Sequence, residues 1–232
     1  MIFDNMAHEI ISEDIITMKY DTILFDLDGT LLYTLEDLTD AINHTLSEYG
    51  FPTHSIDAVR RFVGNGLRLL AIRALPEGEE YERFEQFFKD FVAYYNSHNR
   101  IKTKPYPGVI ETTKRLAELG VKMAIVTNKG QTATDSLMED YFKPAITVAI
   151  GDDGKHKRKP DPEPIDMALS QLGIEDKARV LYVGDSDVDA LTAENSNLDY
   201  VLCTYGFRDY EELKAFNPVL FIDNIAKLLE LF

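Results

Sequence analysis

The sequence predicts an α/β fold in which a doubly wound parallel sheet carries an inserted all-α domain. Short, continuously apolar runs such as Ile23–Phe25 have the composition of buried parallel strands. From residue 105 onward such runs alternate with helical patterns, which favours a parallel sheet with helices on both faces. Between the first run and residue 105 the periodicity is helical only, as an inserted helical domain would show.

Length, cysteine count and net charge exclude several classes of protein and of partner. The 232 residues suffice for a core domain and a smaller insert. A single cysteine, Cys203, excludes an intramolecular disulfide framework and agrees with a cytoplasmic location. The formal net charge of −16 argues against nucleic acid as the main partner, and no apolar run approaches the length of a membrane span. A small phosphorylated substrate is compatible with this charge, and a monomer or a homodimer is expected.

Three segments are expected along the chain. Residues 1–17 contain four acids and no Lys or Arg, fit poorly with the pattern of the remaining chain, and are predicted to be a peripheral extension with Met18 as an alternative start. We expect the core domain to comprise residues 18–33 and 104–232, and a helical cap domain to comprise residues 34–103. If residues 1–17 are peripheral, their deletion leaves folding and activity intact.

Within the cap domain, Thr34 and Asp37 have the spacing of a capping box at the start of a helix. Two further helices are expected over 58–63 and 67–75, on either side of a glycine turn. A longer helix carries an aromatic stripe whose spacing indicates a packing face, consisting of Phe84, Phe87, Phe88, Phe91, Tyr94 and Tyr95.

Helices and strands should alternate in the rest of the core domain. The strands are expected over 121–126, 145–150, 179–183 and 199–203. The helices are expected over 107–119, 131–139, 162–172 and 188–195, with a closing helix over 224–232 that Asn224 caps.

Two carboxylates come directly after the first strand. Asp26 and Asp28 are two positions apart, so in an extended chain their side chains can address the same ligand. Two close anions repel unless a cation relieves them, and Mg²⁺ suits oxygen ligands beside a phosphate. The alternative, that both residues only form a turn, has even odds when the pair is considered alone.

Three later strand-to-loop junctions carry polar residues that suit the same ligand. Thr127 and Asn128 end one strand, Lys159 precedes a helix, and Asp185 follows another strand. Because the carboxyl ends of parallel strands share one edge of a sheet, we expect these side chains to meet there and to form a phosphoryl-transfer site. Some of these residues also have a simpler explanation. Thr127 and Asn128 would then be plain turn residues, and Lys159 would belong to a solvated basic run.

Taken in order, these junctions resemble the four motifs of the haloacid dehalogenase superfamily. The matching strings are Asp-Leu-Asp-Gly-Thr at 26–30, Thr-Asn at 127–128, Lys-Pro at 159–160, and Gly-Asp-Ser at 184–186 with a further acid at 189. The resemblance covers nearly all of residues 19–223. It implies a Rossmann-like core with a small helical cap of the C1 type after the first motif.

The resemblance also implies catalytic roles. Asp26 corresponds to the nucleophile that forms an aspartyl-phosphate, and Asp28 to the general acid and base. Lys159 corresponds to the cation that balances charge on the nucleophile and the phosphoryl group. Thr127 and Asn128 correspond to the phosphate-binding pair.

A magnesium site is implied by the same resemblance. Its ligands would be the carboxylates of Asp26 and Asp185 and the backbone carbonyl of Asp28. Asp189 is expected to support Lys159 or a metal-bound water, with Ser186 beside it.

Several local strings are similar to those of bacterial phosphoglycolate phosphatases, among them residues 62–66, 105–108 and 204–206. By this similarity Gly64, Asn65 and Gly66 form a cap loop over the substrate, and Arg68 contacts a substrate carboxylate. The expected function is a Mg²⁺-dependent phosphoglycolate phosphatase. The alternatives are a phosphatase for pyrophosphate or a sugar phosphate, a β-phosphoglucomutase-like mutase, and a catalytically silent binding module.

Overall fold

The computed structural model describes residues 19–232, so the extension predicted over 1–17 lies outside the described residues. Its main feature is a six-stranded sheet in the order β5-β4-β1-β6-β7-β8, in which every neighbouring pair is parallel. The strands are β1 (Thr22–Phe25), β4 (Lys122–Gly130), β5 (Val148–Asp152), β6 (Val180–Gly184), β7 (Asp199–Cys203) and β8 (Leu220–Ile222).

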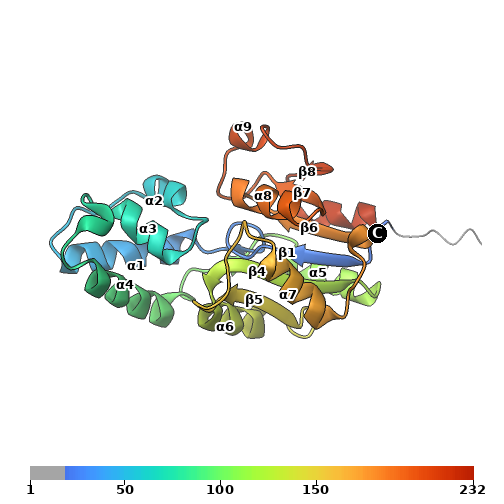
Figure 1. Cartoon of the computed structure of the whole chain (residues 1–232), viewed down its shortest axis with the longest axis horizontal. Helices are drawn as coiled ribbons and strands as arrows, with labels where there is room; N and C mark the ends of the chain where they lie inside the picture. Colours follow the sequence, from blue (N-terminus) through green and yellow to red (C-terminus); the bar gives the residue numbers. More distant parts are fainter. Residues whose placement is uncertain (1–18) are drawn as a thin grey trace, which may run out of the picture.

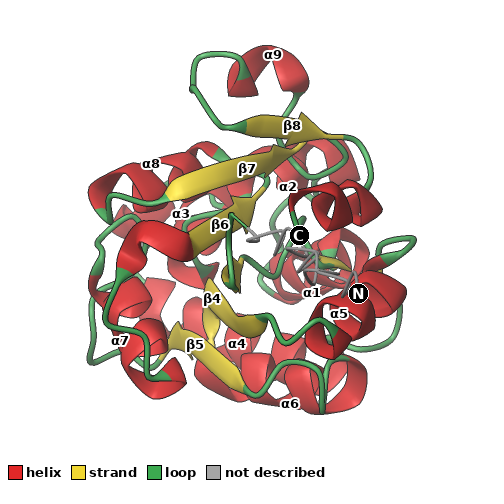
Figure 2. Ribbon diagram, turned by 90° about the vertical axis from the view of Figure 1, so that its right-hand side faces the viewer, coloured by secondary structure: helices red, strands yellow, loops and turns green. Residues whose placement is uncertain are grey.

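Helices cover both faces of this sheet, which confirms the predicted fold class. Figure 2 looks along the sheet and shows α7 and α8 on one face and α5 on the other. In β1, Ile23 and Phe25 enter one apolar cluster and Leu24 enters the other. The helices of the core are α5 (Val109–Glu118), α6 (Gln131–Tyr141), α7 (Glu163–Leu172), α8 (Asp187–Asn195) and α9 (Tyr210–Leu213), together with the 3₁₀ turns Lys177–Arg179 and Ile225–Leu231.

The inserted helices form a separate unit with its own core. Figure 1 shows α1–α4 gathered at one end of the molecule, beyond the sheet. These helices are α1 (Leu35–Glu48), α2 (Ile56–Phe62), α3 (Leu67–Ala74) and α4 (Phe84–His98), with a 3₁₀ turn at Gly78–Glu80. Phe84, Phe87 and Phe91 are buried in this core, as the aromatic stripe on α4 predicts. We call this unit the cap; its exact limits at 34 and 103 stay predictions.

Two short strands mark where the chain leaves and re-enters the core. The strand β2 (Leu32–Tyr33) pairs antiparallel with β3 (Lys104–Pro105). Neither strand was predicted, because two-residue strands carry no periodicity. The predicted capping box is wrong: the Thr34 side chain caps no N–H, whereas Asp37 accepts backbone hydrogen bonds from the return segment 101–103 at 2.9–3.1 Å.

Most remaining differences concern element ends. The strand β4 extends to Gly130, beyond the predicted end at 126, and the closing helix is a 3₁₀ helix that Asn224 caps. The strand β8 and helix α9 were not predicted. Among residues 19–232, no helix combines the length and apolar character that crossing a membrane requires.

Candidate active site

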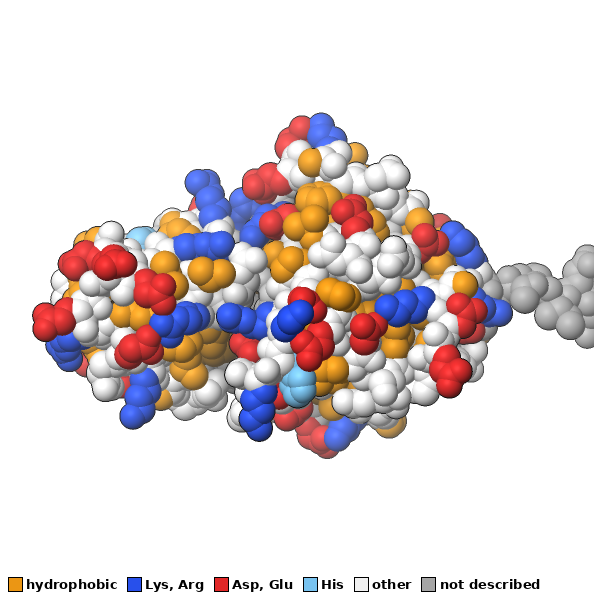
Figure 3. Space-filling view, viewed as in Figure 1, with side chains coloured by type: hydrophobic (Ala, Val, Ile, Leu, Met, Phe, Trp, Pro, Cys, Tyr) orange, Lys and Arg blue, Asp and Glu red, His pale blue; other side chains and the backbone are white. Residues whose placement is uncertain are grey.

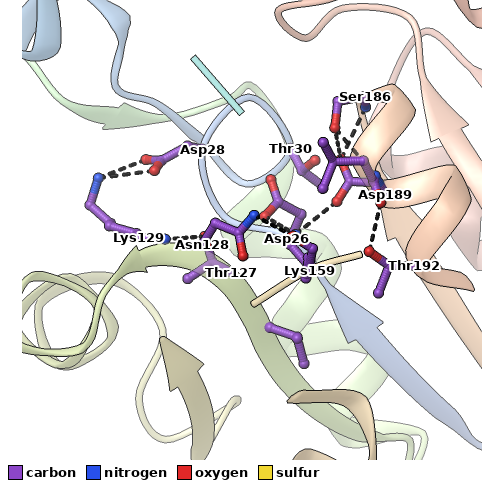
Figure 4. A network of polar contacts seen from close by, with 12 residues as sticks. Asp26, Asp28, Thr30, Thr127, Asn128, Lys129, Lys159, Ser186, Asp189 and Thr192 are labelled. Atoms are coloured by element: carbon purple, nitrogen blue, oxygen red, sulfur yellow. Dashed lines mark hydrogen bonds and ion pairs between the residues drawn. The ribbon is translucent and has the colours of Figure 1, made fainter. Parts of the chain in front are cut away.

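The predicted polar residues come together at the carboxyl edge of the sheet. Asp26 follows β1, Thr127 lies in β4, Lys159 lies between β5 and α7, and Asp185 follows β6. All four side chains are buried. Figure 4 shows Asp26, Thr127 and Lys159 converging, with Asp189 close by. The shared edge of a parallel sheet explains why residues so distant in sequence meet here.

Lys159 is the centre of this cluster. Its Nζ lies 2.6 Å from Asp26 Oδ1 and 2.8 Å from Asp189 Oδ1, and it donates to the Tyr182 hydroxyl at 2.9 Å. Burial alone would lower the pKa of Lys159, but the charges of Asp189 and Asp26 raise it well above its usual range. Lys159 therefore stays charged at this depth and holds both carboxylates in place.

The Asp185 carboxylate is enclosed by hydrogen-bond donors and by two glycines. It accepts a hydrogen bond from Thr30 Oγ1 at 3.1 Å and one from the Phe207 backbone N–H at 2.6 Å. A side chain at Gly29 or Gly206 would overlap with the Asp185 carboxylate, so both glycines are needed for close approach. Burial, together with the charges of Asp189 and Asp26, raises the pKa of Asp185 well above its usual value.

Asp189 joins the start of α8 to Lys159. Its Oδ2 accepts from the backbone N–H groups of Asp185 and Ser186 and from the Ser186 hydroxyl, which forms a capping box at the helix N-terminus. Burial would raise the pKa of Asp189, but the charge of Lys159 and the hydrogen bonds lower it. Asp189 thus contacts Lys159 directly, and Ser186 contacts Asp189; that they support Lys159 in a reaction stays a prediction.

The carboxylate cluster has the composition of a divalent-cation site. One oxygen from each of Asp26, Asp185 and Asp189 lies within 4.8 Å of the others. Three buried carboxylates face the single charge of Lys159, and burial with the neighbouring acids raises the pKa of Asp26 to about 7. A cation here would balance this charge and favour the ionised carboxylates. Oxygen ligands at a buried, polar edge fit a hard divalent metal.

Thr127 and Asn128 lie at an irregularity of the sheet. The register between β4 and β5 shifts between Val126 and Gly130, which removes these residues from regular strand pairing. The Asn128 amide donates to the carbonyls of Lys159 at 3.0 Å and Gly64 at 3.3 Å. Asn128 therefore connects the carboxyl edge of the sheet to the cap, a contact that sequence reasoning missed.

Asp28 has a partner that the sequence reasoning did not single out. Lys129 Nζ lies 2.8 Å and 3.1 Å from the two carboxylate oxygens of Asp28 and also bonds the hydroxyl of Tyr95 from α4. Figure 4 shows the Asp28 carboxylate turned toward Lys129, away from Asp26. The only sequence signal for Lys129 was its position directly after Asn128. For Tyr95 the helical spacing indicates a packing face and gives no sign that its hydroxyl bonds a lysine.

The cap loop is only partly arranged as predicted. Gly64 and Gly66 line the cavity above Asp26, whereas Asn65 accepts a hydrogen bond from Arg73 outside it. Arg68 does not line the cavity; its guanidinium pairs with the acids Glu79 and Glu85 on the cap surface. An arginine from one turn of a short helix cannot be assigned a direction by spacing alone.

Arg208, which sequence reasoning missed, lines the cavity instead. Its guanidinium donates to the carbonyls of Arg60 and Val63 in the cap at 3.3 Å and 2.8 Å, and to Asp187 at 3.1 Å. Its Nη2 also lies beside Gly64. The cavity itself measures about 40 Å³, room for only a few water molecules, and its cap wall includes the apolar Leu67 and Leu70.

This arrangement agrees with what known proteins show. A family model for haloacid dehalogenase-like hydrolases matches residues 23–203. The chain belongs to the haloacid dehalogenase-like hydrolases. It is 36% identical over 218 residues to phosphoglycolate phosphatase 1 of Pseudomonas aeruginosa, which covers 89% of this chain and 78% of that protein.

Two further relatives extend over both parts of the molecule. Phosphoglycolate phosphatase of Psychrobacter arcticus is 32% identical over 224 residues, covering 92% of this chain and 96% of that protein. The crystal structure of a predicted phosphoglycolate phosphatase from Haemophilus somnus superposes with a TM-score of 0.84 at 28% identity, covering 91% of this chain and 97% of the other. The likeness thus includes the cap as well as the sheet.

Proposed function

We propose that this haloacid dehalogenase-like hydrolase is a Mg²⁺-dependent phosphatase that cleaves 2-phosphoglycolate through an aspartyl-phosphate. The observation that carries the proposal is the convergence of Asp26, Lys159 and Asp185 at one buried edge. The names of the relatives that match both the sheet and the cap support the choice of substrate.

In the proposed reaction, a carboxylate oxygen of Asp26 attacks phosphorus while the bond from phosphorus to the ester oxygen breaks. Asp28 gives its proton to the departing alkoxide, which leaves as an alcohol. Asp28 then takes a proton from water as the water oxygen attacks phosphorus, and the bond to Asp26 breaks. Lys159 stabilises charge on Asp26 and on the phosphoryl oxygens throughout.

Mg²⁺ would be held by the carboxylates of Asp26 and Asp185 and by the Asp28 backbone carbonyl. When bound, it supplies Lewis-acid stabilisation of charge on the phosphoryl oxygens. Thr127 and the irregular backbone at Asn128 offer donors for the same oxygens.

The substrate carboxylate needs a cation on the cap side of the cavity. Three basic residues line the cavity in the described part of the chain, and all three are paired with acids: Lys129 with Asp28, Lys159 with Asp26 and Asp189, and Arg208 with Asp187. Only the partner of Arg208 is largely exposed, at 51% of its side chain, and an ion pair open to solvent is the weakest of the three. We therefore assign this contact to Arg208 rather than to Arg68.

Basic side chains also gather at the approach to the site. Figure 3 shows Lys and Arg along the notch between the cap and the sheet. A groove at the junction of cap and core is lined by four arginines, namely Arg60, Arg61, Arg73 and Arg208. Three acids, Asp187, Asp209 and Glu212, line the same groove, so only a small excess of positive charge remains there. In a chain with a net charge of −16, even a small local excess of positive charge favours the approach of an anionic substrate.

A turnover screen tests the proposal. Initial rates are measured with 2-phosphoglycolate, sugar phosphates, pyrophosphate and p-nitrophenyl phosphate, with and without Mg²⁺. We expect the highest kcat/KM for 2-phosphoglycolate and a strict need for Mg²⁺. Higher kcat/KM for a sugar phosphate or pyrophosphate would reassign the substrate, and failure to hydrolyse any ester would indicate a binding module. A cytoplasmic location and a monomeric or homodimeric state stay predictions.

A further inference from the structure

A chain of three contacts joins the cap to the proposed acid and base. The Tyr95 hydroxyl on α4 bonds Lys129 Nζ, and Lys129 bonds both carboxylate oxygens of Asp28 at 2.8 Å and 3.1 Å. Lys129 lies in β4 of the core, so the chain crosses from one structural unit to the other. Tyr95 is the last residue of the aromatic stripe, and its hydroxyl bonds a lysine that lines the cavity.

Packing alone does not explain this arrangement. Only 1% of the Lys129 side chain is exposed, and Tyr95 is fully buried. A buried ion pair usually stabilises a fold less than well-packed apolar residues of the same volume. Asp28 is the one carboxylate that Lys129 pairs with among the described residues, whereas Lys159 pairs with Asp26 and Asp189 on its own side of the cavity. A buried lysine with this single purpose indicates a functional role for the pair.

Lys129 also decides where the Asp28 carboxylate points. The proposed function requires Asp28 to reach the ester oxygen of a substrate bound at Asp26. In the structure Asp28 faces Lys129, both residues line the cavity, and 16% of the Asp28 side chain stays exposed. Both oxygens of the Asp28 carboxylate contact the same charged nitrogen, so a shift of Lys129 shifts Asp28 with it.

We propose that Lys129 is a positioning residue for the Asp28 carboxylate, and that the Tyr95 hydroxyl makes this position depend on the placement of the cap. This inference rests on the proposed role of Asp28. Proton transfer to the leaving group then becomes efficient only when α4 is seated against the core. The cap would thereby control the chemistry as well as access to the site.

The leaving group provides a specific readout. The alkoxide of 2-phosphoglycolate is a strong base and needs a proton as it departs, whereas p-nitrophenolate leaves without one. The ratio kcat/KM reports the steps up to release of the alcohol, before the aspartyl-phosphate is hydrolysed. Misplacement of Asp28 should therefore lower kcat/KM for 2-phosphoglycolate far more than for p-nitrophenyl phosphate.

The experiment uses the full chain with Mg²⁺ and the variants Tyr95→Phe and Lys129→Met, with Asp28→Asn as reference. Tyr95→Phe removes one hydroxyl and keeps the ring, so it tests the contact without emptying the core. The matched control is Tyr94→Phe on the same helix, whose ring stacks between His44 and His98 outside the cavity. Thermal unfolding checks that each variant is folded.

For 2-phosphoglycolate we expect kcat/KM to fall about 10²-fold or more in Asp28→Asn. The fall should be about tenfold or more in Lys129→Met and about threefold to tenfold in Tyr95→Phe, the range of one lost hydrogen bond. For p-nitrophenyl phosphate kcat/KM should change less than about twofold in Tyr95→Phe, and Tyr94→Phe should match the parent protein on both esters.

Equal losses on both esters in Tyr95→Phe, or no loss on either, would overturn the inference even if Lys129→Met fails to fold. The same results with a selective loss in Asp28→Asn would leave the proposed function intact. If Asp28→Asn itself shows no selectivity for the alkyl ester, the proposed role of Asp28 is wrong, and the inference that rests on it fails for that separate reason.

Discussion

The two walls of the cavity differ in how their polar groups are fixed. On the core side, buried charges bind one another: Lys159 contacts Asp26 and Asp189 within 2.8 Å, and backbone N–H groups hold the acids. On the cap side, the wall combines the loop glycines with apolar Leu67 and Leu70 and is tied to the core through Arg208 and Asn128. Under the proposed function, the core side supplies the reacting groups and the cap side selects the substrate.

The largest expected loss of activity follows a substitution on the core side of the cavity. Asp26→Asn removes the attacking oxygen and should reduce turnover of every phosphate ester to background, because an amide cannot form the covalent intermediate. Circular dichroism should show the parent helix content. Asp166→Asn, a surface change on α7, serves as the control, and residual activity of Asp26→Asn on any ester would contradict the assignment of the nucleophile.

Removal of Mg²⁺ from the proposed site on the core wall should also abolish activity. Treatment with EDTA should abolish activity, and Mg²⁺ should restore it and raise the Tm, since an ion that binds the folded protein stabilises it. In Asp185→Asn the Mg²⁺ concentration for half-maximal Tm shift should rise about tenfold or more, equivalent to a loss of about 1.4 kcal/mol of binding free energy. An unchanged Mg²⁺ response would remove Asp185 from the metal site.

A smaller, substrate-dependent effect is expected on the cap side. Arg208→Gln keeps some donors but loses the charge, and should raise KM for 2-phosphoglycolate about tenfold with little change for p-nitrophenyl phosphate. Arg68→Ala is the matched control, because its guanidinium faces Glu79 and Glu85 on the surface. A selective rise in KM for Arg68→Ala instead would restore the assignment made from the sequence.

The smallest effect on activity is expected where the two units join. Asp37→Ala leaves three backbone N–H groups of the return segment without their acceptor and should lower the free energy of unfolding by about 1–3 kcal/mol. Thr34→Val should leave it nearly unchanged, because the buried Thr34 hydroxyl has no hydrogen-bond partner among the described residues. Urea unfolding monitored by circular dichroism measures both, and a larger loss in Thr34→Val would reinstate the capping box.

Contacts between the two units were the hardest feature to predict. Lys129 and Asp28 are 101 positions apart, and Arg208 and Val63 are 145 positions apart. A local pattern carries no information about which of several arginines turns toward a cavity, so Arg68 was chosen and Arg208 was missed. Tyr95 was assigned to packing because periodicity reports the face of a helix and not the reach of a hydroxyl.

The sequence by itself determined the sheet, its helical cover and the identity of the residues at the strand ends. It could do so because apolar runs define buried strands and because parallel strands place their carboxyl ends along one edge. Only the tertiary structure decided how Lys129, Tyr95 and Arg208 connect the cap to that edge. These links depend on how two separately packed units meet, and the energies that fix such a junction come from contacts between distant residues rather than from any local spacing.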